Sequence, residues 1–508
     1  MLTAFLFLTL YAVKHVGNSG GERPPTRLAV LPLEILSGDV TQQYFADEMT
    51  DDIIAKLGQI HALRPIGRVT VMQYKNSTNS PQEIANQLKV SAVVQGKLKR
   101  DGDKLHIEAR LFQSRNDRQP RSAILSTGLE RDLREVFKLQ NEIVLAIAAA
   151  MQVRLRAEEQ RRLADAPAVN PVALGLYYQG RAKTRAFSDT NNKEAIRLCE
   201  RALEIDKSFA PAWAELAGDC INQVYNFEPK ISKLEDKALS SLLEAIRINP
   251  ELALAYEKHG NLLWSPIRNF QHEEAINLFR HALQLNPSSI GALHWSSWVY
   301  NHTGFSDQAI AKAEEVAALD PVFDTAVLSL ACSHLWKGEY HESLLLWPRA
   351  AVFLCSLTGS HWAWTLFALG QTNEAHRKIA EYLQKIPEDR PGELTAMEAV
   401  LLAAEGKEAE AVAKIRIAEE KTATNFGETH HCTYLIACAY ARLNKTREGI
   451  RWLKQAADKG FPCYPLFVRD PNLANLRADA EFQAFLKAQE QDWLRRSNLW
   501  FRAEAAAK

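Results

Sequence analysis

Few residues in this 508-residue chain have the types and spacing that a reaction would need. Gly175 and Gly180 are spaced like glycines of a phosphate-binding loop, but Arg181-Ala182 follow where Lys and Ser or Thr would contact phosphate and magnesium, so the match fails. The sequence contains no His-Glu-x-x-His, Gly-x-Ser-x-Gly or kinase catalytic-loop pattern. We therefore expect no catalytic residues and no enzyme activity.

Two pairs of adjacent polar residues have the chemistry to hold a ligand. His430 and His431 offer ring nitrogens to a metal, but neighbouring helix positions point about 100° apart, so we expect a solvated helix start. Asp51 and Asp52 are expected near a helix start, where carboxylates complement the helix dipole. The seven cysteines include no Cys-x-x-Cys pair, which indicates neither a zinc site nor a disulfide framework. The sequence predicts no metal and no cofactor.

A phrase that recurs in the middle of the chain indicates binding instead of reaction. Its four copies begin at Glu194, Lys237, Glu274 and Gln308. Each copy has small or apolar residues at the spacing of one helix face, and the last three end in Asn-Pro or Asp-Pro, where proline stops a helix. The interval from Pro287 to Pro321 is thirty-four residues, which is the period of tetratricopeptide repeats.

The chain therefore resembles tetratricopeptide repeat proteins over residues 171–460. We expect about eight helical hairpins there, stacked as an all-α superhelical solenoid. In one copy, Ser296 and Ser297 fill the small positions of the first helix and Gly304 lies in the turn, because paired helices approach closely only where small residues face each other. Residues 461–508 are expected to form capping helices and a tail.

Stacked first helices would line a concave surface suited to a protein or peptide partner. Aromatic rings give such a surface rigid apolar contacts, and amides between them can bond to a main chain. The predicted groove residues are Trp264, His294, Trp295, Trp298, Asn301, His361 and Trp364. In the alternative interpretation, Trp295, Trp298 and Trp364 pack between repeats and contact no partner.

Residues 27–165 lack the repeat period and are predicted to form an α+β domain. Apolar runs and alternation predict a strand at 28–33 and a hairpin of strands at 92–98 and 105–112 around Asp101-Gly102, with β-branched residues returning at 64–74. Apolar residues at helical spacing, and proline in the first turn of the second segment, predict helices at 44–60, 81–88 and 133–164.

Residues 27–57 read RLAVLPLEILSGDVTQQYFADEMTDDIIAKL, and this stretch resembles the start of the TolB-like amino-terminal domain. Leu33, Ile35 and Glu48 stand where that family usually has Phe, Asn and Gly. The resemblance implies an α+β domain without catalytic residues. In that family, tetratricopeptide repeats often follow, and the two parts commonly form the sensory half of bacterial membrane-tethered winged-helix regulators, nucleotide cyclases or Ser/Thr kinases. None of those effector sequences occurs in this chain.

The first sixteen residues are an apolar stub. Residues 2–13 carry no charge, but as a helix they would measure about 18 Å against a hydrocarbon core of about 30 Å. No Lys or Arg precedes them, so the segment is a poor secretory signal. We expect part of a membrane helix or a signal anchor, or alternatively a frayed tail, followed by a linker at 17–26. The predicted location is membrane-anchored with the bulk periplasmic, and a cytoplasmic location is the alternative.

Charge and repeats together leave two functions open. The 61 basic and 61 acidic residues cancel, which argues against a general electrostatic attraction to nucleic acid. The first function is a non-enzymatic protein-interaction scaffold or sensory module of a bacterial envelope signalling system. The second is the sensory half of a membrane-tethered winged-helix regulator, adenylate or guanylate cyclase, or Ser/Thr kinase whose effector domain lies upstream. The sequence predicts no oligomeric state.

Overall fold

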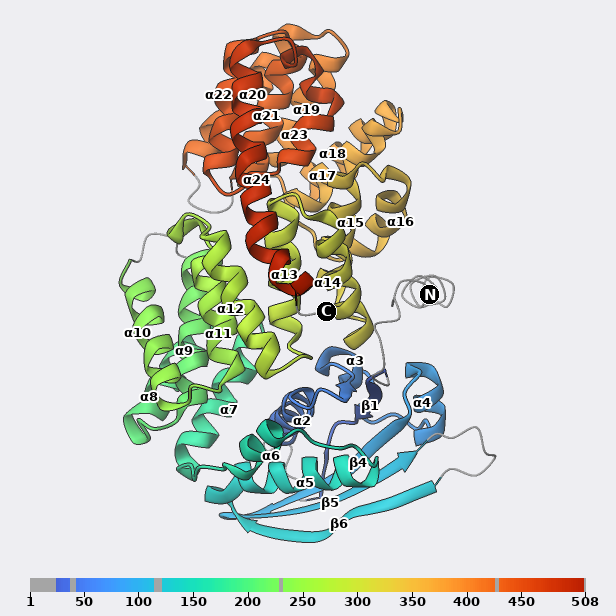
Figure 1. Ribbon diagram of the computed structural model, residues 1–508, viewed down its shortest axis with the longest axis vertical. Helices are drawn as coiled ribbons and strands as arrows, with labels where there is room; N and C mark the ends of the chain where they lie inside the picture. The colour runs from blue at the N-terminus through green and yellow to red at the C-terminus, as the bar shows by residue number, and fades with distance from the viewer. Residues whose placement is uncertain (1–23, 37–42, 114–120, 228–231, 425–428, 507–508) are drawn as a thin grey trace. The chain divides into compact units, whose positions relative to one another are not determined.

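One mixed sheet forms the amino-terminal part of the protein. The computed structural model describes residues 24–36, 43–113, 121–227, 232–424 and 429–506 (Figure 1). The strands are β1 (Thr26–Val30), β2 (Glu34–Ile35), β3 (Leu63–Pro65), β4 (Ala92–Asp101), β5 (Lys104–Gln113) and β6 (Arg121–Asp132). Their order is β3-β1-β4-β5-β6, with β2 also paired to β4. β1 runs parallel to β3 and β4, whereas β4, β5 and β6 are antiparallel neighbours.

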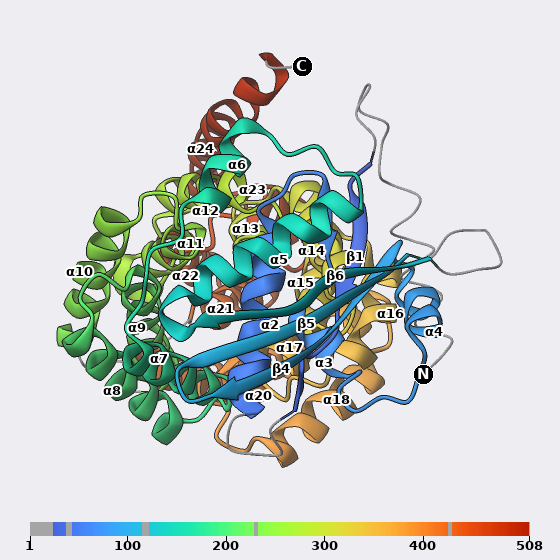
Figure 2. The same ribbon diagram turned by 90° about the horizontal axis from the view of Figure 1, so that it is seen from below.

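Helices cover one face of this sheet. They are α2 (Gln43–Gly58), α3 (Arg68–Met72), α4 (Pro81–Leu88), the short 3-10 turn η2 (Leu133–Glu135), α5 (Val136–Ala150) and α6 (Ala157–Ala164). Seen from below, α5 lies along β5 and β6, with α2 beside it (Figure 2). On β5, Leu105, Ile107 and Leu111 are buried, whereas Glu108 and Arg110 are exposed. This alternation is expected for an antiparallel sheet with one buried and one solvent-exposed face.

Two segments of this part differ from the sequence expectation. Within 64–74 the strand ends at Pro65, and Arg68–Met72 is helical. The helix expected over 133–164 is broken after Ala150, where Gln152 has a positive φ of 56°. A new helix begins at Ala157 because the buried Glu159 carboxylate accepts hydrogen bonds from the backbone N–H groups of Arg156 and His61, both at 2.8 Å.

Pairs of consecutive helices occupy residues 171–458. The eight pairs are α7 (Pro171–Arg185) with α8 (Asp189–Ile205), α9 (Ala210–Asn222) with α10 (Ser232–Ile248), α11 (Ala253–Leu263) with α12 (His272–Leu285), α13 (Ile290–His302) with α14 (Ser306–Leu319), α15 (Asp324–Lys337) with α16 (Tyr340–Ala350), α17 (Ser356–Ala368) with α18 (Thr372–Lys385), α19 (Glu393–Ala404) with α20 (Glu408–Thr424), and α21 (His430–Arg442) with α22 (Thr446–Asp458). A π-helical turn, η3 (Gln223–Phe227), follows α9, and the 3-10 turn η4 (Pro266–Arg268) follows α11. This part of the chain is an all-α helical repeat.

Helix ends in the repeats follow a common turn. Gly304, Gly338, Gly370 and Gly406 each lie between the two helices of a pair and have a positive φ between 75° and 85°. A β-carbon on Gly304 would also lie 2.4 Å from Cδ of Pro465. Glycine is therefore required at this turn both by the backbone conformation and by the close neighbour.

The chain divides into two compact units. Unit 1 comprises residues 1–262, 278–293 and 315–323, and unit 2 comprises 263–277, 294–314 and 324–508. Unit 2 ends with α23 (Tyr464–Arg469), the 3-10 turn η5 (Pro471–Leu476) and the long helix α24 (Ala480–Ala506). The sheet is thus not a compact unit of its own, because the first repeats share unit 1 with it. Among the helices within the described ranges, none combines the length and hydropathy needed to cross a bilayer.

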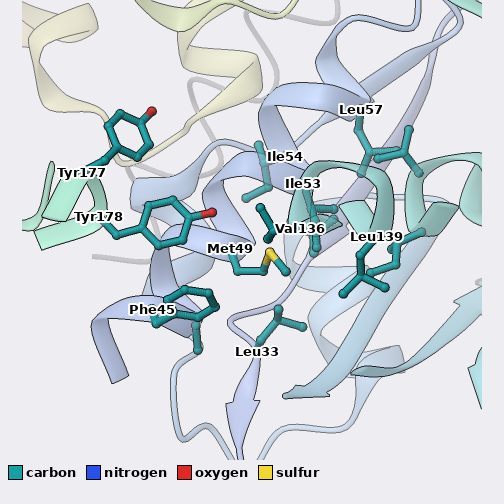
Figure 3. Packing of buried hydrophobic residues seen from close by; sticks show 14 of the residues in the cluster. Leu33, Phe45, Met49, Ile53, Ile54, Leu57, Val136, Leu139, Tyr177 and Tyr178 are labelled. Atoms are coloured by element: carbon teal, nitrogen blue, oxygen red, sulfur yellow. The ribbon is translucent and has the colours of Figure 1, made fainter. Parts of the chain in front are cut away.

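An apolar core and a buried ion network join α2 to the first repeat helix in unit 1. Met49 and Ile53 of α2 face Val136 and Leu139 of α5, and Tyr178 of α7 approaches from the other side (Figure 3). All five side chains are buried in one cluster. The sheet, its covering helices and α7 therefore share one continuous core.

The ion network centres on Arg181. Its guanidinium lies 3.1 Å from Glu48, 2.5 Å from Asp51 and 2.6 Å from Asp52, measured between the closest nitrogen and oxygen atoms. Burial disfavours the charged guanidinium, but the surrounding acidic groups outweigh this and raise the pKa of Arg181. Arg185 adds ion pairs to Glu48 and Asp51. The expectation that Asp51 and Asp52 complement a helix start is wrong, since α2 begins at Gln43 and both carboxylates bind Arg181.

The proline turns that stop the repeat helices also contact the sheet region of unit 1. Buried Asp320, in the Asp-Pro turn after α14, accepts hydrogen bonds from the N–H groups of Val69 (3.0 Å) and Thr70 (2.8 Å) and from the Thr70 hydroxyl (2.5 Å). Asn286, in the preceding Asn-Pro turn, donates to the Ala55 carbonyl at 3.3 Å. The same residues therefore end repeat helices and dock the α+β part.

Candidate functional site

Six of the seven residues predicted to line a groove are buried. Trp295 is half-buried and is the one member of the set whose side chain remains accessible. The buried six are Trp264, His294, Trp298, Asn301, His361 and Trp364. Their burial is what the alternative interpretation, packing between repeats, requires of Trp298 and Trp364. A peptide lying on the surface of unit 2 would reach Trp295 and not the other six.

Asn301 shows how the predicted groove amides are used. Its side-chain NH₂ group donates to the Ser329 carbonyl at 3.3 Å. Ser297, one helical turn earlier on α13, lies with its hydroxyl 2.6 Å from that of Ser329 on α15. These bonds tie the first helices of adjacent repeats together, so the small and amide residues of α13 serve helix packing.

Several predicted groove residues meet inside unit 2, in the company of residues that the sequence did not single out. Trp264 lies 5.0 Å from His302 and Trp298 lies 6.4 Å from Trp336, between ring centroids. His361 lies 5.3 Å from His431. We call this group the histidine–tryptophan centre, and it consists of Trp264, Trp298, His302, Trp336, His361, His430, His431 and Phe461.

Three imidazoles converge within the histidine–tryptophan centre. Nε2 of His302, the last residue of α13, lies 3.0 Å from Nε2 of His430 and 3.0 Å from Nε2 of His431. One ring nitrogen from each of the three lies within 4.8 Å of the other two. Nδ1 of His302 lies 2.8 Å from the Trp298 carbonyl, and Nδ1 of His431 lies 3.7 Å from the carboxylate of Glu393 on α19.

The expectation of a solvated helix start at His430 and His431 is wrong. Their exposed fractions are 0% and 1%. The physical reason is that α21 is covered on nearly every side, with all residues from His430 to Ala439 buried. Two adjacent side chains about 100° apart can therefore both face protein, and here both turn towards His302.

Burial keeps these rings neutral. It lowers the pKa of His302 and of His361 to about 3 and that of His294 to about 4, because no nearby carboxylate compensates an imidazolium there. The pKa values of His430 and His431 also lie well below the usual value, chiefly through burial. Neutral imidazoles keep one nitrogen lone pair each, which is the form that accepts a hydrogen bond or binds a metal.

Sequence reasoning missed His302, Trp336 and Phe461. His302 follows Trp298 by four residues, which places both on one face of α13, and this was the one local signal available. No spacing rule connects His302 with His430, which is 128 residues away in the chain. The three-histidine arrangement is a product of tertiary packing alone.

Comparison with known proteins gives partial matches. No family model matches the chain. It is 32% identical over 215 residues to "Putative adenylate cyclase 3" of Rhizobium meliloti, covering 41% of this chain and 36% of that protein. It is 25% identical over 120 residues to a chloroplastic protein of Arabidopsis thaliana, covering 24% of this chain and again 36% of the relative. The chain thus spans about a third of the length of these curated relatives.

Among solved structures, a tetratricopeptide repeat protein from Parabacteroides merdae covers 53% of this chain and 98% of its own length. The sequence identity is 16% and the TM-score is 0.37.

Proposed function

We propose that this chain is a non-enzymatic scaffold or sensory module that binds a protein segment along its helical repeats. The observation that carries the proposal is the series of eight consecutive helix pairs between residues 171 and 458. Repeated helix pairs expose long surfaces built from neighbouring repeats, and proteins of this architecture use such surfaces for docking. The partner segment would contact the predicted groove at Trp295, whose ring is accessible.

Photo-crosslinking in cells tests this binding. A photoreactive amino acid replaces Trp295 in one variant of the full chain and Trp362 in a matched control, because Trp362 is also a half-buried tryptophan but lies on α17 beneath Lys378. We expect a discrete protein cross-link from position 295 and none from position 362. The same products from both positions, or none from position 295, would contradict the proposed contact.

The proposal that the chain has no activity of its own is tested separately. We expect the purified chain to form no cyclic nucleotide from ATP or GTP with Mg²⁺ or Mn²⁺, because its sequence has no phosphate-binding loop or cyclase pattern. Turnover that persists through purification and follows the chain on a sizing column would refute this part of the proposal and leave the binding test unaffected.

A second candidate function is the sensory half of a larger signalling protein. It is favoured by the match to a Rhizobium meliloti protein described as an adenylate cyclase, of which this chain covers 36%. Under this proposal, a cyclase, winged-helix or Ser/Thr kinase domain is encoded upstream of the first residue. Sequencing the genomic DNA before the first codon tests it: an in-frame effector sequence is expected, and an in-frame stop codon next to a ribosome-binding site would exclude it.

We also propose that the protein acts at the bacterial envelope, with residues 1–16 as the membrane-associated segment and the bulk periplasmic. Those residues lie outside the described ranges, and the proposal rests on their lack of charge between positions 2 and 13. An alkaline phosphatase fusion at Gly20 should be active if the chain is exported. Activity limited to a cytoplasmic reporter at the same position would support the cytoplasmic alternative.

Balanced charge supports a protein partner over direct binding to nucleic acid.

A further inference from the structure

We propose that His302, His430 and His431 form a metal site: a three-imidazole centre inside unit 2 that binds one divalent cation of the zinc type. The proposal rests on three observations of the described residues. Nε2 of His302 lies 3.0 Å from the Nε2 atoms of both other rings, the hydrogen atoms of neutral rings cannot satisfy both of these contacts, and outer polar groups lie behind two of the rings.

Two of the three nitrogen separations are close to those of a zinc centre. Zinc–nitrogen bonds of about 2.0–2.1 Å in a tetrahedral arrangement place ligand nitrogens about 3.3 Å apart. The Nε2 atom of His302 is 3.0 Å from that of His430 and 3.0 Å from that of His431. Small side-chain rotations would therefore admit the ion. Three imidazoles without a thiolate favour zinc, copper or nickel over magnesium or calcium, which take oxygen ligands.

Hydrogen-bond accounting of the neutral rings leaves a conflict. The Trp298 carbonyl only accepts, so the His302 proton sits on Nδ1 and its Nε2 is an acceptor. That single lone pair faces two Nε2 atoms, of His430 and of His431. It can accept a hydrogen bond from one of them, and the other then brings a second hydrogen or a second lone pair against it at 3.0 Å. No choice of neutral tautomers satisfies every contact, whereas a cation accepts all three Nε2 lone pairs at once.

Polar groups lie next to the Nδ1 atoms of His302 and His431, on the side away from the proposed metal. Metal-binding histidines usually donate their other ring N–H to a carbonyl or a carboxylate, which fixes the ring and strengthens it as a ligand. The Trp298 carbonyl has that position for His302, and the Glu393 carboxyl group lies 3.7 Å from Nδ1 of His431, just beyond hydrogen-bond distance. Glu393 is itself only 3% exposed, and in its ionised form it would offset part of the cost of burying a cation.

Aromatic rings close the surroundings of the site. Trp336 lies 5.4 Å from His302 and 5.2 Å from His431, and Phe461 lies 5.5 Å from His302, between ring centroids. Because the site is buried, the ion is expected to enter most readily while the chain folds. Trp336 would also report binding, since Co²⁺ and Cu²⁺ quench the fluorescence of a neighbouring tryptophan.

Metal content after refolding tests the proposal. The full chain is unfolded in urea with EDTA, refolded with or without Zn²⁺, desalted and measured by mass spectrometry for zinc. In a parallel sample Zn²⁺ is added after folding. We expect about one zinc per chain in the refolded sample. The matched control His294→Gln changes another buried histidine of α13 and should keep the zinc, whereas His302→Gln should lose it.

Three results would overturn the proposed metal site. Retention of one zinc by His302→Gln would show binding elsewhere on the chain and overturn the proposal, as would wild-type protein that takes up no zinc by either route. If His302→Gln fails to fold, Glu393→Gln replaces it and should weaken zinc binding about 10–100-fold while His294→Gln does not. Equal zinc affinity in wild type and Glu393→Gln would then overturn the assignment.

Discussion

The two units bury polar side chains in opposite electrical states. In unit 1, Arg181 is buried as a cation among three carboxylates of α2. In unit 2, the histidine–tryptophan centre buries imidazoles that remain neutral. Both arrangements hold polar groups away from water, but Arg181 is held as an ion and the imidazole rings are themselves uncharged. The units should therefore fail under different substitutions and at different pH.

Removing the central cation of unit 1 should have the largest effect. Arg181→Met leaves Glu48, Asp51 and Asp52 without their shared partner, and breaking a buried ion pair from one side costs about 3–5 kcal/mol. We expect a loss of that size in the free energy of unfolding of unit 1, measured by urea titration with hydrogen exchange of the α2 amides.

A surface pair in the same unit provides the control for Arg181. Arg247 lies 2.6 Å from Glu244 but is 69% exposed, so Arg247→Met should leave the free energy of unfolding nearly unchanged. Similar losses in the two variants would mean that burial of the α2 network adds nothing to its contribution.

The next largest effect is expected from acid, which should lower the stability of unit 2 before that of unit 1. The folded pKa of His294 is about 4, below the usual 6.5, so the unfolded chain binds more protons as pH falls through 6.5 and unit 2 loses stability. His294 alone accounts for about 2 kcal/mol by about pH 5. In unit 1, burial raises the pKa of Asp219. The folded chain then binds the extra proton, so this group stabilises unit 1 as pH falls, in contrast to His294 in unit 2.

Tryptophan fluorescence measures the acid effect selectively. Of the eleven tryptophans, only Trp213 belongs to unit 1, so the signal reports unit 2. We expect the urea midpoint seen by fluorescence to fall between about pH 7 and pH 5, while the α2 amides keep their exchange protection. If the α2 amides lose protection at a higher pH than the fluorescence change, unit 1 is the more acid-sensitive unit and the prediction is wrong.

The Asp-Pro turn after α14 should matter less than the ion network. Asp320→Ala leaves the N–H groups of Val69 and Thr70 without their acceptor and should cost about 1–2 kcal/mol. Amide exchange at these two residues should accelerate most. Asp320→Asn keeps one acceptor oxygen and should show a smaller effect. Unchanged exchange in Asp320→Ala would mean that this docking contact does not hold the start of α3.

The smallest change for each pH unit is expected from Lys56, as a slope of stability with pH. Burial lowers the pKa of Lys56, whose ammonium donates to Asn141 at 2.7 Å, to about 8. Between about pH 8 and 10 the unfolded chain binds more protons, so stability rises by about 1 kcal/mol per pH unit. Lys56→Met should flatten that rise in urea titrations, and equal slopes in both proteins would contradict the assignment.

Local signals in the sequence were enough for several elements of the fold. The helix expected at 81–88 is present as α4, where Ser80 and Glu83 form a capping box. The hairpin at Asp101-Gly102 joins β4 to β5, with Gly102 at a positive φ of 58°. In each case one turn or one cap within a few residues specifies the conformation, so a sequence window contains the whole cause.

Features that depend on distant partners were not predicted. Strand β6 was missed, and the break between α5 and α6 depends on Glu159 accepting from His61, 98 residues earlier. In the sequence, Arg181 is only a residue that breaks a phosphate-binding loop pattern, and Glu48 is only a departure from the TolB-like pattern. The two side chains form a buried ion pair, but nothing near either residue in the sequence indicates it.

The route of the chain between the units limits how the protein can be dissected. Helices α12, α13 and α14 each contribute residues to both units, because the chain enters unit 2 at 263 and 294 and returns to unit 1 at 278 and 315. Any fragment boundary placed between 263 and 323 would take pieces from both cores. Neither half is therefore expected to be recoverable as a folded fragment, and binding work on this protein calls for the intact polypeptide.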